Sequence, residues 1–172
     1  MRCYKRICRQ TERSLARSHM NMNKTDENSE LKLHEKIFLG SSVIFNLAVS
    51  GVYISSKIDS SALLKIFGGI VVSLIIPFTV SLVGYIKTKA NKKIIVSHMF
   101  IIFYLLAEIL LDYIFKIPFR EILAIHIPYI IVFYAAAFSI IGVSRTISRK
   151  TGLMVFSTFL FLIGCLIYNL FG

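Results

Sequence analysis

Charged residues are scarce in this 172-residue sequence, because Asp, Glu, Lys and Arg make up only 17% of it, whereas 56% of the residues are hydrophobic. The mean hydropathy is +0.72. A soluble domain of this length cannot hide so much apolar surface in its core. The composition therefore predicts a protein that dissolves its apolar surface in lipid.

Cysteine is also scarce. Cys3 and Cys8 lie in the N-terminal segment and Cys165 lies in a long apolar run. A tetrahedral zinc site needs four ligands, and no second pair completes one here. We expect a free pair near the N-terminus and a packing residue at Cys165, with no metal site.

Catalytic signatures are missing too. The sequence has no phosphate-binding loop, no metalloprotease His pair, no nucleophile elbow and no internal repeat. The polar gaps, of roughly five to ten residues by the usual lengths of helix connections, are too short for a separate catalytic domain. We therefore expect a protein that is not an enzyme and has no cofactor, with any functional site lying among helices.

Five long apolar stretches fill most of the chain, each near the roughly 20 residues that cross a bilayer as a helix. They cover residues 37–56, 63–86, 94–115, 122–143 and 153–171. A chain in lipid must satisfy its own backbone hydrogen bonds, and no stretch alternates as barrel strands do. The fold class expected is an all-α, polytopic transmembrane bundle in residues 37–172. The first stretch is rich in Ser, so a four-span alternative with a re-entrant first segment stays open.

Lys and Arg are distributed unevenly between the two sides of such a bundle, sixteen on the side of the N-terminus and four on the other. The positive-inside rule then predicts a cytoplasmic N-terminus and a C-terminus outside, in the cell (plasma) membrane. The two cytoplasmic gaps contain no Asp or Glu, so they should attract anionic lipid headgroups. The bias disfavours dual topology, and any homo-oligomer should be parallel.

The first 36 residues form a polar, basic segment that we expect to be cytoplasmic and largely disordered. Five of its arginines fall within residues 1–17, opposite a more apolar helical face. This pattern fits a membrane-surface helix or a targeting segment. Alternatively, residues 1–21 reflect a mis-assigned start upstream of Met22. No cleaved signal peptide is expected, and without a reader motif no nucleic-acid partner is expected either.

Small residues recur at four-residue steps in the second stretch, at Gly69, Ser73, Pro77 and Ser81. This spacing predicts a helix-packing stripe. Pro77 lacks an amide proton and clashes with a carbonyl one turn earlier, which predicts a kink. In the first stretch Asn46 lies near mid-membrane, where an asparagine either cross-links helices or lines a polar route.

The third and fourth stretches carry the most informative polar residues. Their connection is short, which predicts an antiparallel hairpin. Glu108, Asp112 and Lys116 follow at four-residue steps and would share one face of an α-helix, and Arg120 and His126 open the fourth stretch. Glu108 and His126 lie deeper than the others by about one turn or more at 1.5 Å per residue. We therefore expect these two to meet.

A charged residue at depth is costly, so it normally faces the bundle interior and finds a partner. A carboxyl and an imidazole in low dielectric can relay protons or bind a cation. The alternative is a ladder of ion pairs that joins the acidic residues to Lys116 or Arg120 and closes the hairpin.

Three functions are consistent with this sequence. The first is a small transporter or channel protomer with a proton- or cation-handling site at Glu108 and His126, near the outer side. The second is an accessory subunit of a larger membrane complex. The third, ranked last, is an intramembrane lipid enzyme that uses Glu108 or Asp112 as base and His126 as acid.

Overall fold

The computed structural model describes residues 31–115 and 123–171, and every regular element in these ranges is a helix. The helices are α2 (Leu33–Lys57), α3 (Ser61–Ser73), α4 (Ile75–Lys87), α5 (Lys92–Glu108), the π-helix η1 (Ile109–Ile114), α6 (Leu123–Ile147) and α7 (Arg149–Phe171). Within the described ranges, five segments are long and apolar enough to cross a membrane. The all-α fold with five spans is thus confirmed.

Helix α2 is continuous over 25 residues, so the re-entrant alternative for the first span is wrong. Its buried serine side chains bond to carbonyls one turn earlier on the same helix. Ser42 donates to the Phe38 carbonyl at 2.7 Å and Ser50 donates to the Asn46 carbonyl at 2.7 Å. Such back-bonding lets hydroxyl groups lie in an apolar helix without unpaired donors. The helix begins at Leu33, four residues before the expected start, while residues 1–30 with Cys3 and Cys8 lie outside the described ranges.

Two tight turns connect α2 to α3 and α4 to α5. Asp59 and Lys89 each adopt a positive φ, 56° and 51° respectively. A left-handed residue just beyond a helix lets the following amides bond to the last carbonyls, here Ser60 to Ser55 at 3.1 Å and Ala90 to Tyr85 at 3.0 Å. These turns reverse the chain in a few residues and place successive spans side by side.

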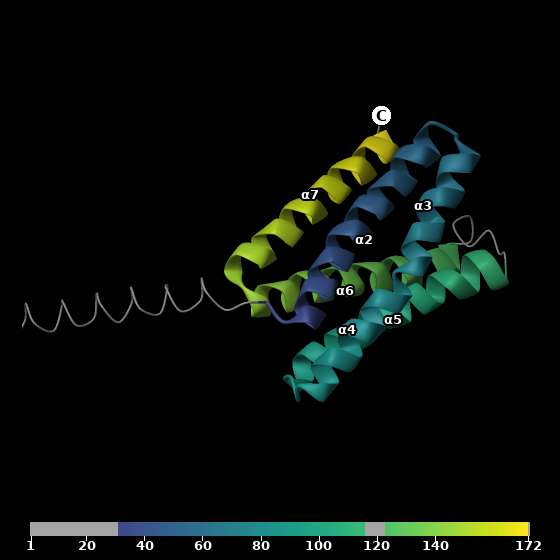
Figure 1. Cartoon of the computed structure of the whole chain (residues 1–172). Coiled ribbons are helices and arrows are strands. Elements are labelled where there is room, and N and C mark those ends of the chain that lie inside the picture. The colour runs from purple at the N-terminus through teal and green to yellow at the C-terminus, as the bar shows by residue number, and fades with distance from the viewer. Residues whose placement is uncertain (1–30, 116–122, 172) are drawn as a thin grey trace, which may run out of the picture. The chain divides into compact units, whose positions relative to one another are not determined.

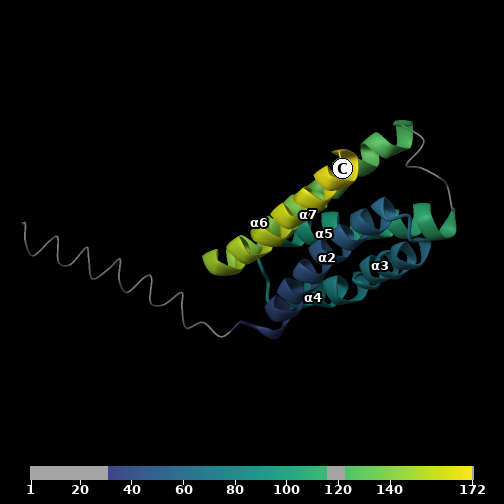
Figure 2. The same ribbon diagram turned by 90° about the horizontal axis from the view of Figure 1, so that it is seen from above.

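Helix α2 lies between α7 and the α3–α4 pair (Figure 2). Helix α6 contacts both α5 and α7, and α4 contacts α5. Helices α5 and α6 form the expected antiparallel hairpin. Much of the core is a row of edge-to-face rings along α2, in which Phe38 and Phe45 contact Phe78, and Phe45 also contacts Tyr104. The outer surface is apolar, with Ile76 and Phe103 more than half exposed, as a lipid-facing surface requires.

The expected kink in the second span is a break between α3 and α4 at Leu74, three residues before Pro77. It lies where the ring of a proline interferes with the preceding turn. The buried face is continuous through the break and consists of Val71, Leu74, Phe78, Ser81 and Tyr85, at steps of three and four residues. Pro77 is partly buried, but Ser73 and Gly69 are exposed. A single packing stripe at strict four-residue steps within this chain is therefore wrong, because each such step turns about 40° around an α-helix and leaves the buried face.

Helices α6 and α7 are joined by Ser148 alone and diverge from that joint (Figure 1). At the joint Gly152 lies against Arg145 so closely that a Cβ on Gly152 would be 2.9 Å from the Arg145 Cα. Only a residue without a side chain allows this approach. The opposite ends of α6 and α7 are separated, and α2 and α5 complete the walls of the space between them.

Candidate functional site

Glu108 is the last residue of α5 and is 7% exposed. The π-helix η1 follows it directly, and the Phe115 amide donates to the Leu110 carbonyl at 2.8 Å, five residues back. π-Helical turns are rare and often occur near functional sites. Glu108 ends the α-helix and Asp112 lies in the π-helix, so no regular α-helical turn joins them. That Glu108, Asp112 and Lys116 share one face stays a prediction. Lys116 and Arg120 lie outside the described ranges.

Three polar side chains form a connected row between α5 and α6. Tyr129 of α6 donates a hydrogen bond to the Glu108 carboxylate. The hydroxyl oxygens of Tyr104 and Tyr129 are 3.0 Å apart. Tyr104 is 2% exposed, so the row runs from the core of the bundle to the carboxylate. Hydrogen-bonded hydroxyls of this kind hold a buried carboxylate in place and can also pass protons.

His126 lies three residues before Tyr129 on α6, and their rings are stacked, with centroids 6.5 Å apart and planes 17° from parallel. The His126 Nδ1 atom is buried and has no hydrogen-bond partner within the described ranges. Glu108 and His126 line the same cavity, with Tyr129 in contact with both. The His126 ring therefore borders the cavity, while its Nδ1 atom is shielded from it. That the Glu108 and His126 side chains meet directly stays a prediction.

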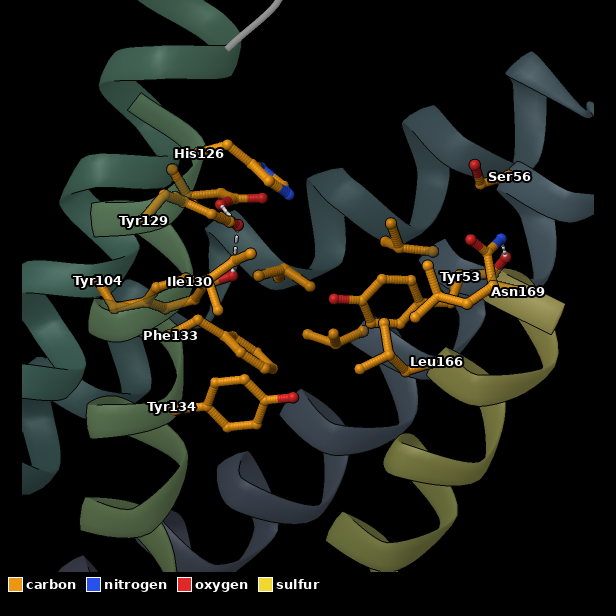
Figure 3. Close-up of a pocket in the computed structure, with 15 residues that line it drawn as sticks. Tyr53, Ser56, Tyr104, His126, Tyr129, Ile130, Phe133, Tyr134, Leu166 and Asn169 are labelled. Carbon is orange, nitrogen blue, oxygen red and sulfur yellow. Dashed lines mark hydrogen bonds between the residues drawn. The ribbon is translucent and has the colours of Figure 1, made fainter. Parts of the chain in front are cut away.

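The cavity has a volume of about 420 Å³ and lies between the diverging helices (Figure 3). Its lining comes from α2, α3, α5, α6 and α7. Tyr134 and Tyr53 point into it from opposite walls (Figure 3). On the α7 side the Asn169 side chain donates to the Tyr53 carbonyl at 2.8 Å, which fixes the amide at the cavity edge. The polar groups are thus few and face an otherwise apolar space.

Not every predicted site residue belongs to this cavity. Asp112 is partly buried and is not among the lining residues. Asn46 is buried between α2 and α7, where its amide donates to the Thr158 hydroxyl at 2.8 Å. Asn46 therefore cross-links two helices, which is the structural alternative that the sequence left open.

The sequence did not indicate that tyrosines line the cavity. Tyr104, Tyr129 and Tyr134 look like ordinary packing residues in the sequence, because nothing in a hydropathy pattern separates a packed ring from one that borders a cavity. A signal is visible in retrospect. Tyr104 is four residues before Glu108 and Tyr129 is three residues after His126, so each tyrosine lies about one helical turn from a polar residue on its own helix.

A comparison with family models, curated proteins and solved structures finds no match to this chain.

Within the described ranges no three His, Cys, Asp or Glu side chains lie close enough to hold a metal ion. The polar groups that line the cavity are one carboxylate, one imidazole, several phenol hydroxyls, the Ser56 hydroxyl and the Asn169 amide, and the rest of the lining is apolar.

Proposed function

We propose that this protein is a small membrane transporter or channel protomer that handles a proton or another cation at Glu108 and His126. The observation that carries the proposal is the hydrogen-bonded row from Tyr104 through Tyr129 to Glu108, which ends at the wall of a 420 Å³ cavity. A buried carboxylate inside a bundle is expensive in lipid, and such residues typically mark ion and proton routes.

The location of the cavity supports a route that opens on one side. Its lining residues Tyr53 and Asn169 lie within about two turns of the C-terminal ends of α2 and α7, and His126 lies near the start of α6. The basic residues Lys87, Lys92 and Arg149 lie at the opposite helix ends. By the positive-inside rule the cavity would face the outside of the plasma membrane, with the N-terminus in the cytoplasm.

Proton flux in reconstituted vesicles tests the proposal. Vesicles with a trapped pH-sensitive dye and an imposed pH gradient should equilibrate faster with the protein than without it. Glu108→Gln should slow the flux about tenfold or more, equivalent to about 1.4 kcal/mol, because it removes the ionisable group while keeping its shape. Asp112→Asn is the matched control and should change the rate by less than about twofold, since Asp112 does not line the cavity. Equal rates for Glu108→Gln and the unaltered protein would reject proton transport at this site.

A second candidate function is that of an accessory subunit in a larger membrane complex or a parallel homo-oligomer. Gly69 of α3 is exposed, and nothing lies within 4 Å of the place where a Cβ would stand. Small residues let a neighbouring helix approach closely in lipid. Crosslinking from Gly69→Cys in native membranes, read by mass spectrometry, should yield one stoichiometric partner or a dimer. Crosslinks that are as scarce as those of an Ile76→Cys control would reject this function.

A further inference from the structure

The size of the cavity sets the class of ligand it can hold. A volume of about 420 Å³ lies within the usual range of roughly 300–1,000 Å³ for small-molecule sites. A proton or a bare ion would leave most of this space unfilled. The class of ligand that this cavity takes deepens the proposed function and rests on it.

The charge of the lining favours a cation. Among the lining residues within the described ranges, Glu108 is the one acidic side chain, and Lys and Arg are absent. On this wall the Tyr129 hydroxyl donates to the Glu108 carboxylate, and the Tyr104 hydroxyl lies 3.0 Å from that of Tyr129. An anionic ligand would meet a like charge in a space of low dielectric, whereas a positive ligand would meet an opposite one.

The aromatic rings favour an organic cation over an inorganic one. Four rings form a continuous wall on α5 and α6, with centroid separations of 5.7 Å from Tyr129 to Tyr104, 5.5 Å from Tyr104 to Phe133 and 5.3 Å from Phe133 to Tyr134. Tyr53 adds a fifth ring from the opposite wall (Figure 3). Aromatic groups attract alkylammonium ions electrostatically and also bind their apolar parts.

We propose that this cavity binds a small organic cation, a substituted ammonium whose charged head lies at Glu108 and whose apolar body lies along the wall of rings. Ile130 and Leu170 line the edge of the cavity and are exposed, so an amphipathic ligand meets an apolar surface before it reaches the carboxylate. The Asn169 side chain and the Ser56 hydroxyl also line the cavity and supply polar groups for a substituent at the other positions.

Calorimetric titration of the full chain in nanodiscs of zwitterionic lipid tests this proposal, with empty nanodiscs as the blank. Benzyltrimethylammonium should bind at least tenfold more tightly than tetramethylammonium, because its larger apolar body covers more of the ring wall. Choline should bind at least tenfold more tightly than 3,3-dimethylbutan-1-ol, its uncharged carbon analogue. Absence of benzyltrimethylammonium binding, or equal binding of choline and its analogue, would overturn the proposal.

Variants locate the binding. Glu108→Gln should weaken benzyltrimethylammonium at least tenfold, while Asp112→Asn should leave it within about twofold. If Glu108→Gln does not fold, Val52→Phe in the cavity wall replaces it, with Val80→Phe on the 50% exposed surface of α4 as the matched control. Val52→Phe should abolish binding by filling space. Binding that survives Glu108→Gln or Val52→Phe unchanged would place the ligand elsewhere and overturn the proposal.

The result also separates this inference from the proposed function. Proton flux that depends on Glu108, without binding of benzyltrimethylammonium, would retain the transport proposal and reject the organic cation. Binding without any flux would retain the organic cation and reject transport. Failure of both experiments would reject both proposals.

Discussion

The two ends of the helical bundle contain the same residue types and use them differently. The packed end, formed by His34, Phe38, Ser81, Tyr85 and His98, lies where α2 begins, α4 ends and α5 begins. The cavity end, formed by Tyr104, Glu108, His126, Tyr129 and Tyr134, lies between α5 and α6 near the opposite helix ends. Each end has a buried tyrosine and a histidine, which is fully buried at the packed end (His98) and partly buried at the cavity end (His126).

At the packed end the histidine is enclosed by other side chains. His98 is fully buried, and its ring centroid lies 4.7 Å from that of Phe38 and 4.9 Å from that of Tyr85. Its ring nitrogens lie 3.0 Å from the Ile94 carbonyl and 3.5 Å from the Ser81 hydroxyl. At the cavity end His126 borders open space. A histidine inside the bundle therefore indicates a candidate site only where the surrounding helices leave open space beside it.

The largest expected effect is on stability at the packed end. Phe38→Ala should lower the free energy of unfolding by about 3–5 kcal/mol, because a fully buried ring that contacts Phe78, Tyr85 and His98 leaves a cavity. Loss of helicity on titration with a denaturing detergent measures this. Phe103→Ala, at a position 58% exposed, should change it by less than about 0.5 kcal/mol. Similar losses for the two variants would mean that this end is not closely packed.

A smaller loss of stability is expected at the closest helix approach of the packed end. A Cβ on Gly84 would lie 2.4 Å from the His34 Cβ. Gly84→Ala should therefore lower the free energy of unfolding by about 1–3 kcal/mol through overpacking. Gly142→Ala, where nothing lies within 4 Å, should raise it by about 0.5–1 kcal/mol instead. The same detergent titration distinguishes these opposite signs, and a stabilising Gly84→Ala would contradict the contact.

At the cavity end a substitution should affect activity more than stability. His126→Gln should slow proton or cation flux about tenfold, or about 1.4 kcal/mol, because it removes the imidazole while keeping a polar side chain. Stability should change by less than about 0.5 kcal/mol. His98→Gln should show the reverse pattern, with lower stability and unchanged flux per folded molecule. Equal effects of His126→Gln and His98→Gln on both flux and stability would mean that the two ends do not differ in this way.

The smallest effect is expected for a single hydrogen bond of the row. Tyr104→Phe removes the hydroxyl that lies 3.0 Å from Tyr129 but leaves the ring wall intact. Hydrogen bonds between membrane helices contribute about 0.6 kcal/mol on average. We expect a change of that size in the detergent titration and unaltered binding of benzyltrimethylammonium. A tenfold weaker binding would show that the hydroxyl, rather than the ring, contacts the cation.

Much of the fold could be predicted from the sequence because lipid imposes strict rules. Apolar length determines the spans, and the short connection between the third and fourth spans determines their antiparallel pairing. The break near Pro77 follows from proline chemistry. The packing stripe expected at four-residue steps fails, because the buried face follows steps of three and four residues through the break. The π-helix after Glu108 has no sequence signal that periodicity detects.

The candidate site could be predicted only in part. Glu108 and His126 stand out in the sequence because polar residues at depth are rare in membranes. Asn46 stands out for the same reason but bonds to Thr158 across the bundle, and no single-chain pattern identifies that partner. His98 lies only six residues after the start of α5, where a histidine in a membrane protein often faces the interface, yet it is fully buried because Phe38 of α2 packs against it. The cavity itself depends on the angle at which α6 and α7 diverge, and no pattern along the chain gives that angle.

The joint between α6 and α7 has a mechanical consequence. Helix α7 ends at Phe171, and Leu170 lies eighteen residues beyond Gly152, which is about 27 Å along the helix at 1.5 Å per residue. The helix acts as a lever arm with its pivot at the Gly152–Arg145 contact. A tilt of roughly 5° at the pivot would move Leu170, on the cavity edge, by about 2 Å at that arm length. The width of the entrance is therefore controlled most sensitively from the opposite end of the bundle, farthest from any ligand.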